Sequence, residues 1–239
     1  MTPLDEVEGL ARAEGLTVLG GLHPGPQDGA PAGTGTLLLL GPDGPRWEVR
    51  FTVSPEARDG GRDPIDRWSR RVIGGLAARL GGAAIFPFEG PPWPPVLAWA
   101  LRSGMAWISP IGMLVHARVG LWFSVRGILA LPHRLALPDP PAASPCETCA
   151  EKPCRSACPV GAFAGGRYDV PACIGHLQGA GRTTCLAAGC AARQACPVGV
   201  VFRPLPVQAA RHMAAFLASN APRAVEGPGD KPVDELESD

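Results

Sequence analysis

The cysteines of this chain are confined to one stretch of its sequence. All eight lie between residues 146 and 196 of a 239-residue chain, and the first 145 residues contain none. They form two runs that each end in Cys-Pro, made up of Cys146, Cys149, Cys154 and Cys158, then Cys173, Cys185, Cys190 and Cys196. So many thiols at such close spacing are not explained as inert buried side chains, so they indicate metal binding or disulfides.

Two runs ending in Cys-Pro are typical of ferredoxins with two iron–sulfur clusters, in which the last cysteine of each run binds the other run's cluster. This crossing rule predicts two 4Fe-4S clusters. Cys146, Cys149, Cys154 and Cys196 would hold one, and Cys158, Cys173, Cys185 and Cys190 the other. The first run departs from the bacterial spacing only between Cys149 and Cys154, whereas the second run is irregular.

Zinc and disulfides are the alternative explanations of the same thiols. Two zinc ions with four thiolates each would use the same number of ligands, but zinc ribbons carry two Cys-x-x-Cys pairs and this chain has one. A disulfide framework would require a secreted chain. The N-terminal segment 1–8 is acidic and resembles no signal peptide, so we expect a reducing, cytoplasmic location.

Composition excludes some classes of partner. The 22 basic and 22 acidic residues give zero formal net charge, which does not favour nucleic acid as a partner. No apolar run approaches the roughly 18 residues of a membrane span, so we expect no membrane partner. The hydrophobic fraction of 46% is sufficient for a folded core.

Hydrophobic periodicity predicts a mixture of helices and strands. Apolar side chains at helical spacing predict helices over 4–14, 63–80, 94–104 and 206–217. In the second of these, Asp63 is placed to cap the helix and Pro64 to occupy its first position. Short apolar or alternating segments predict strands over 16–19, 36–40, 47–53, 83–86, 112–116 and 121–131.

The segment 121–131 carries the clearest candidate for a ligand pocket outside the cysteines. In a strand, Trp122, Ser124 and Arg126 would share one face, because side chains alternate with a period of two. An aromatic ring, a hydroxyl and a charge together are typical of a ligand pocket, although a solvent-facing sheet edge would show the same pattern. The opposite face is ordinary apolar core.

Changes in composition divide the chain into four parts. Residues 1–131 form a first domain, and the Pro-rich segment 132–145 is an interdomain linker. Residues 146–219 form the ferredoxin-like domain with a C-terminal helix. Residues 220–239 are rich in Pro, Gly and acidic residues, and we expect them to be a disordered tail.

Three segments resemble the cobalamin-processing protein CblC: residues 63–68, the helix end at 99–104, and His116 to Gly127. The last corresponds to a His-Pro-Arg-x-Gly-Gly-Trp-Phe-x-x-Arg-Gly stretch in that family. Here Ala117 replaces the proline and Leu121 the second glycine. The order of domains resembles that of epoxyqueuosine reductase, QueG, and reductive dehalogenases. In QueG a segment that reads roughly Gly-Leu-Gly-Trp-Ile-Gly-Lys precedes the hairpin; it corresponds to residues 104–110 here, without the lysine.

This resemblance implies an α+β fold, in which a nitroreductase-like or flavin-reductase-like cobalamin-binding domain precedes a small two-cluster ferredoxin domain. It implies that the first domain binds cobalamin base-off, with flavin as the alternative cofactor. His116 would line the pocket or serve as a structural strand residue, and Arg126 would meet a corrin amide or a substrate carboxylate. The implied pocket residues are Trp107, Ser109, Pro110, His116, Gly120, Trp122, Ser124 and Arg126.

The resulting hypothesis is an iron–sulfur oxidoreductase that delivers electrons from its clusters to a corrinoid, for cobalamin reduction or removal of its upper ligand. It requires an external low-potential electron donor as a partner. Two alternatives stay open. One is a QueG-like or dehalogenase-like reductase of another substrate, with cobalamin as its cofactor. The other is a non-enzymatic cobalamin carrier or electron-transfer ferredoxin.

Overall fold

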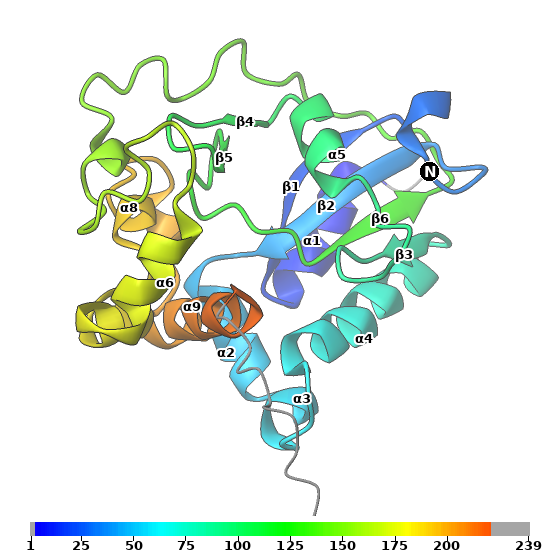
Figure 1. The fold of residues 1–239 in the computed structure, drawn as a ribbon. Helices are drawn as coiled ribbons and strands as arrows, with labels where there is room; N and C mark the ends of the chain where they lie inside the picture. The colour runs from blue at the N-terminus through cyan, green and yellow to red at the C-terminus, as the bar shows by residue number, and fades with distance from the viewer. Residues whose placement is uncertain (1–2, 221–239) are drawn as a thin grey trace, which may run out of the picture.

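The computed structural model describes residues 3–220 and shows a molecule of mixed helix and sheet (Figure 1). A four-stranded antiparallel sheet with the strand order β1-β2-β6-β3 lies in the N-terminal half. Its strands are β1 (Leu16–Leu22), β2 (Thr36–Pro42), β3 (Ala83–Ile85) and β6 (Gly127–Leu131). A separate hairpin pairs β4 (Ala106–Ile108) with β5 (Leu114–His116). The coarse expectation of an α+β chain is therefore confirmed.

Both halves contain helices, and each half has one long helix, α4 in the N-terminal half and α9 in the C-terminal half. In the N-terminal half they are α1 (Leu4–Ala13), α2 (Pro45–Thr52), α3 (Pro55–Arg58), α4 (Pro64–Arg79) and α5 (Val96–Arg102). The C-terminal half contains α6 (Val170–Gln178), α7 (Cys185–Ala188), α8 (Ala191–Gln194) and α9 (Pro206–Asn220). Short 3-10 turns lie at Pro26–Asp28, Pro153–Arg155, Ala180–Thr183 and Val200–Phe202. Strands are absent from the described residues after 131.

Strand β2 lies inside the sheet and contributes to a core on each face. Its four leucines alternate: Leu38 and Leu40 pack with α1, α2 and α4, while Leu37 and Leu39 pack with α5 and the β4–β5 hairpin. All four are fully buried. The strand sequence is continuously apolar rather than alternating, because helices or a hairpin cover both faces of the sheet.

Helix α2 corrects one prediction, since residues 47–53 were expected to be a strand. The segment alternates apolar and polar residues, yet Trp47 and Phe51 also stand four residues apart, the spacing of neighbours on a helix face. Their rings stack with centroids 4.8 Å apart, and both meet Trp68 of α4 edge-on. This aromatic cluster favours the helix over the strand.

The predicted strand over 121–131 is wrong in its first half. Pairing with β2 begins at Gly127, opposite Leu40, and residues 121–126 form a turn and an extended approach to it. The Trp122 N–H closes the turn by donating to the Val119 carbonyl at 3.1 Å. The Arg126 N–H donates to the Leu40 carbonyl at 2.7 Å. The predicted alternation of faces therefore applies only from residue 127.

Helix α4 follows the predicted stripe. Trp68, Val72 and Leu76 are buried against the sheet, and Pro64 occupies the first turn as expected. Asp63 precedes the helix, but its side chain makes no capping hydrogen bond and its φ is 48°. The helix therefore depends on its apolar face rather than on its predicted cap.

The linker 132–145 is fastened to the sheet at its start. The Thr36 hydroxyl donates to the His133 carbonyl at 2.8 Å and accepts from the Leu135 N–H at 2.9 Å, and Leu135 is buried in the core. The first residues of the linker are therefore part of the N-terminal fold, and the rest of it connects this fold to residue 146. The predicted disordered tail after residue 220 lies outside the described residues.

Helix α9 joins the C-terminal half to the N-terminal half, and Figure 1 shows it beside α2. Arg211 of α9 donates to the buried Glu48 carboxylate of α2 at 2.6 Å. Its guanidinium also lies over the Phe51 ring, 5.3 Å from the centroid. Arg193 makes a second link by donating from Nε to the Leu121 carbonyl at 2.7 Å.

Candidate functional site

Four of the cysteines surround a small cavity beside the β4–β5 hairpin. Cys146, Cys149, Cys154 and Cys196 all line it, together with Ser109 and Pro110. Burial raises the pKa of the Cys154 thiol, and the neighbouring Cys146, Cys196 and Cys149 raise it further. Proximity to three further thiolates is unfavourable for isolated charges, so a positive metal centre would stabilise this group.

Three of the other four cysteines, Cys158, Cys173 and Cys190, lie near Tyr168, and Cys185 lies near Cys173 and Cys190. Burial raises the pKa of Cys173, and the nearby charges of Cys158 and Cys185 act in the same direction. Cys190 lies beside Cys185, and the pKa of its thiol is also raised by burial. The pKa of Tyr168 is raised mainly by burial and also by its hydrogen bond with Cys173. The two groups contain the same cysteines as the crossing rule predicts.

Neither group has the close spacing of a single-ion site. Within residues 3–220, no three His, Cys, Asp or Glu side chains are arranged to hold one metal ion.

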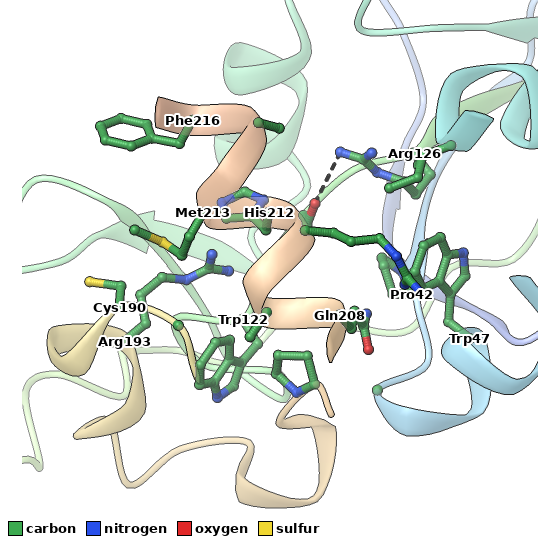
Figure 2. A pocket seen from close by; sticks show the side chains of 18 of the residues that line it. Pro42, Trp47, Trp122, Arg126, Cys190, Arg193, Gln208, His212, Met213 and Phe216 are labelled. Atoms are coloured by element: carbon green, nitrogen blue, oxygen red, sulfur yellow. Dashed lines mark hydrogen bonds between the residues drawn. The ribbon is translucent and has the colours of Figure 1, made fainter. Parts of the chain in front are cut away.

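A cavity of about 450 Å³, here called the first cavity, lies where the two halves meet (Figure 2). The N-terminal half contributes Trp122, Ser124 and Arg126 to its wall. The C-terminal half contributes Cys190 and Arg193 from the cysteine-rich segment. It also contributes the α9 side chains Gln208, His212, Met213 and Phe216.

A second cavity of about 480 Å³ shares a wall with the first. The shared residues are Cys190, Arg193, His212, Met213 and Phe216. Its other walls come from the β4–β5 hairpin and from Tyr168. Its rim carries the exposed apolar side chains Leu97, Leu101 and Ile108, of which Ile108 is 68% exposed.

The first cavity contains two arginine side chains whose surroundings disfavour their charge. Burial lowers the pKa of both arginines. The charge of Asp66 opposes this shift at Arg126, and that of Cys190 opposes it at Arg193. Arg193 lies over the Trp122 ring, 4.9 Å from its centroid, and Arg126 donates to the Ser124 hydroxyl at 3.3 Å. Desolvation of the His212 ring, together with the charges of Arg193 and Arg126, lowers its pKa to about 4. His212 as a whole is nonetheless exposed to solvent, so the lowered pKa reflects the packing of the ring itself and the two nearby arginine charges.

The structure separates the eight pocket residues predicted from the sequence. Trp122, Ser124 and Arg126 line the first cavity. Ser109 and Pro110 instead line the small cavity of the first cysteine group, and Trp107 packs in the apolar cluster beside that group. His116 and Gly120 line none of these cavities.

His116 has a structural role in the N-terminal half. It is fully buried, and its Nδ1 accepts from the backbone N–H groups of Arg118 at 3.0 Å and Val119 at 3.2 Å. Its Nε2 therefore carries the proton and donates to the Leu19 carbonyl at 2.7 Å. Burial lowers its pKa to about 4. Both ring nitrogens have backbone partners, so of the two roles that the sequence left open for His116 the structure shows the structural one and not the pocket-lining one.

Gly120 belongs to a contact between the halves rather than to a pocket. It adopts φ 60°, and a Cβ there would collide with the Val198 carbonyl of the second Cys-Pro loop. Gly199 in that loop, at φ 73°, approaches Val119 equally closely. These two glycines allow the backbone of the hairpin segment to touch the loop that carries Cys196.

The C-terminal wall of the cavities was missed by reasoning from the sequence. Arg193, His212 and Met213 face both cavities, yet no motif distinguishes them from surface helix residues. The position of Arg193 between two predicted cluster ligands, Cys190 and Cys196, was the one available signal. The packing of α8 and α9 against the N-terminal half brings these side chains to the site.

Comparison with known proteins does not assign the chain. No known family's sequence profile matches it, and no curated protein shows significant sequence similarity to it. No helix among residues 3–220 is long and apolar enough to cross a membrane. An assignment of function must therefore be argued from the cysteine groups and the cavities themselves.

Proposed function

We propose that this chain is an iron–sulfur reductase that passes electrons from two 4Fe-4S clusters to a corrinoid bound between its two halves. The observation that carries the proposal is the position of Cys190. This cysteine belongs to the second cysteine group and also lies in the wall of both cavities. A cluster held by that group would stand next to whatever the cavities bind.

The cysteine groups fit the clusters. Each supplies four thiols, the number that a 4Fe-4S cluster requires, from the combination of runs that two-cluster ferredoxins use. Cys154 and Cys196 of the first group and Cys185 of the second are less than a tenth exposed, and apolar side chains pack around both groups. Burial and limited solvent access are among the features that set the reduction potential of such clusters.

The cavities suit a large ligand that is partly flat and apolar. Each lies within the roughly 300–1,000 Å³ typical of ligand sites, and flexible side chains such as Met213 form their shared wall. Rearrangement of that wall would join the two spaces. The apolar rim of Leu97, Leu101 and Ile108 would contact the face or edge of a corrin ring.

The corrinoid would supply the cobalt redox chemistry, and the chain's residues would provide its surroundings. Trp122 and Phe216 offer aromatic contact area, and Arg126 and Ser124 offer hydrogen-bond donors. His212 adds an imidazole that can donate or accept. Met213 and Phe216 exclude water from the wall next to Cys190.

The proposal is tested by following cobalt reduction in variants of each cysteine group. Anaerobically purified chain is loaded with cobalamin, and the cobalt spectrum is followed by stopped flow after a low-potential reductant is added. Cys158→Ser damages the group that includes Cys190. We expect it to slow cobalt reduction at least about tenfold, equivalent to about 1.4 kcal/mol in the barrier, while cobalamin remains bound.

Cys149→Ser is the matched control, because it removes one thiolate from the other group. Both variants should lose iron to a similar extent, so any difference in cobalt reduction reports which group lies next to the cavities. If the Cys158 variant reduces cobalt as fast as the unaltered chain, the second group is not on the electron path and the proposal fails.

A further inference from the structure

The first cavity is surrounded by polar atoms that have no partner. Among residues 3–220, five buried side-chain nitrogen or oxygen atoms lack a hydrogen bond, and four of these belong to residues that line this cavity. They are Trp47 Nε1, Trp122 Nε1, Arg126 Nε and Gln208 Oε1. Three of the four are N–H donors. Buried polar groups normally find partners, so these donors are available to a ligand with several acceptor atoms.

The charges around the cavity favour an anion among such ligands. Arg126 forms no ion pair with any described residue, although Asp66 is the carboxylate close enough to influence it. Arg193 uses Nε for the Leu121 carbonyl, and no described residue accepts a hydrogen bond from its terminal nitrogens. Arg211, the third arginine in the wall, is already paired with Glu48.

The two arginines approach the cavity from opposite halves of the molecule. Figure 2 shows the guanidiniums of Arg126 and Arg193 on the two sides of His212, and both charges act on the His212 ring. A carboxylate presents two oxygens in one plane, which suits a single guanidinium fork. A phosphate presents oxygens in several directions and can accept from two forks at once.

We infer that the first cavity binds the phosphate group of an organic ligand, held by Arg126 and Arg193 and bordered by the indole N–H of Trp122. This inference depends on the proposed function in one respect only, namely which molecule carries the phosphate. If the corrinoid ring occupies the second cavity, the phosphodiester of its nucleotide tail can lie in the first. A phosphorylated flavin would present the same group to the same arginines.

Paired probes that differ in phosphate test this inference. Anaerobic full-length chain with intact clusters is titrated with cobalamin and with cobinamide, which lacks the nucleotide tail and its phosphodiester. The same protein is titrated with flavin mononucleotide and with riboflavin. We expect the phosphorylated member of one pair to bind at least about tenfold tighter than its partner. Inorganic phosphate should compete with the phosphorylated member alone.

Variants show whether the two arginines cause the preference. Arg126→Gln and Arg193→Gln should each weaken binding of the phosphorylated probe roughly tenfold to hundredfold, because each removes a charge-assisted hydrogen bond. The probe without phosphate should bind each variant as it binds the unaltered chain. Arg193→Lys keeps the charge but loses the fork, so its effect should be intermediate. Exposed Arg155, changed to Gln, controls for loss of one positive charge.

The outcomes separate this inference from the proposed function. Equal binding of cobalamin and cobinamide, with no competition from phosphate and no preference between the flavins, overturns the phosphate site and leaves corrinoid binding intact. Arginine-dependent binding of flavin mononucleotide without binding of any corrinoid supports the phosphate site and overturns the proposed function. Iron content and the visible cluster absorption of each variant confirm that it is folded, and a glutamine variant that loses iron is replaced by the lysine variant at the same position, Arg126→Lys or Arg193→Lys.

Discussion

The two halves of this molecule are held together by different means. In the N-terminal half, a sheet buries apolar side chains on both faces, and its two core clusters include five buried aromatic side chains, Trp47, Phe51, Trp68, Phe86 and Trp99. The C-terminal half has smaller clusters, one shared with the β4–β5 hairpin segment and one of its own, and cysteines are among the buried members of both. Hydrophobic burial can stabilise the first half alone, whereas the second has the character of small domains that require a metal.

The largest effect should follow removal of the metal. We expect anaerobic protein to contain about eight irons per chain. Chelation of the iron should abolish protection from hydrogen exchange over residues 146–200, because the binding energy of a structural metal is folding energy. Protection over 16–42 and 127–131 should persist.

Hydrogen exchange measured by mass spectrometry, with and without chelator, resolves the two segments. Metal analysis on the same sample is the control. Stoichiometric zinc without iron would contradict the cluster assignment. An unchanged exchange pattern after complete loss of metal would show that the C-terminal half folds by apolar burial, as the N-terminal half does.

The second-largest effect is expected on the stability of the N-terminal core. Trp68→Ala removes a fully buried indole that meets both Trp47 and Phe51, and should lower the free energy of unfolding by about 3–5 kcal/mol. Trp93→Ala, at a side chain that is 63% exposed, should change it by less than about 0.5 kcal/mol. Denaturant unfolding followed by circular dichroism measures both. A loss of iron in folded Trp68→Ala protein would show that the halves are not independent.

The same contrast explains what the sequence could predict. Cysteine spacing is a local signal, and it grouped the thiols in the sets that lie together in the structure. The strands β1, β2 and β3 and the helices α1, α4, α5 and α9 were also predicted near their observed positions, because each carries its periodicity within a few residues.

Prediction failed where distant segments decide the outcome. Trp47 to Val53 alternates like a strand, but Trp68 and α9 stabilise it as a helix. Trp122, Ser124 and Arg126 do line a cavity, although the strand geometry that suggested it is absent there. Arg193 of α8 and His212 of α9 could not be predicted as site residues, because each reaches the site through the packing of its helix against the N-terminal half, which no local pattern encodes.

The buried histidine gives the N-terminal half a specific response to pH. The pKa of His116 is lowered to about 4 by burial, whereas an unfolded histidine titrates near 6.5. Below 6.5 the unfolded state binds a proton that the folded state does not, so stability falls as the pH decreases toward 4. Between pH 7 and pH 5 this contribution should lower the free energy of unfolding by about 2 kcal/mol.

Denaturant unfolding of the full chain at the two pH values, followed by tryptophan fluorescence, measures this loss. The His116→Gln variant is the reference, because glutamine does not titrate in this range. The variant should be less stable at pH 7, since it disturbs three hydrogen bonds, but it should lose about 2 kcal/mol less than the unaltered chain on acidification. Equal losses would show that His116 is protonated in the folded protein.

The smallest expected effect concerns the contact between α9 and α2, where the two halves meet. Arg211 and Glu48 form an ion pair in which the carboxylate is 4% exposed and the guanidinium 33% exposed. Solvent contact at Arg211 limits the value of the pair, so a double-mutant cycle with Arg211→Met and Glu48→Gln should give a coupling of about 1 kcal/mol. Arg70 and Glu89, which are 49% and 46% exposed, form a matched pair within the N-terminal half and should give less than about 0.5 kcal/mol. If the two couplings are equal, burial at this contact adds nothing to the ion pair. The contact over Phe51 would then be what holds α9 in place.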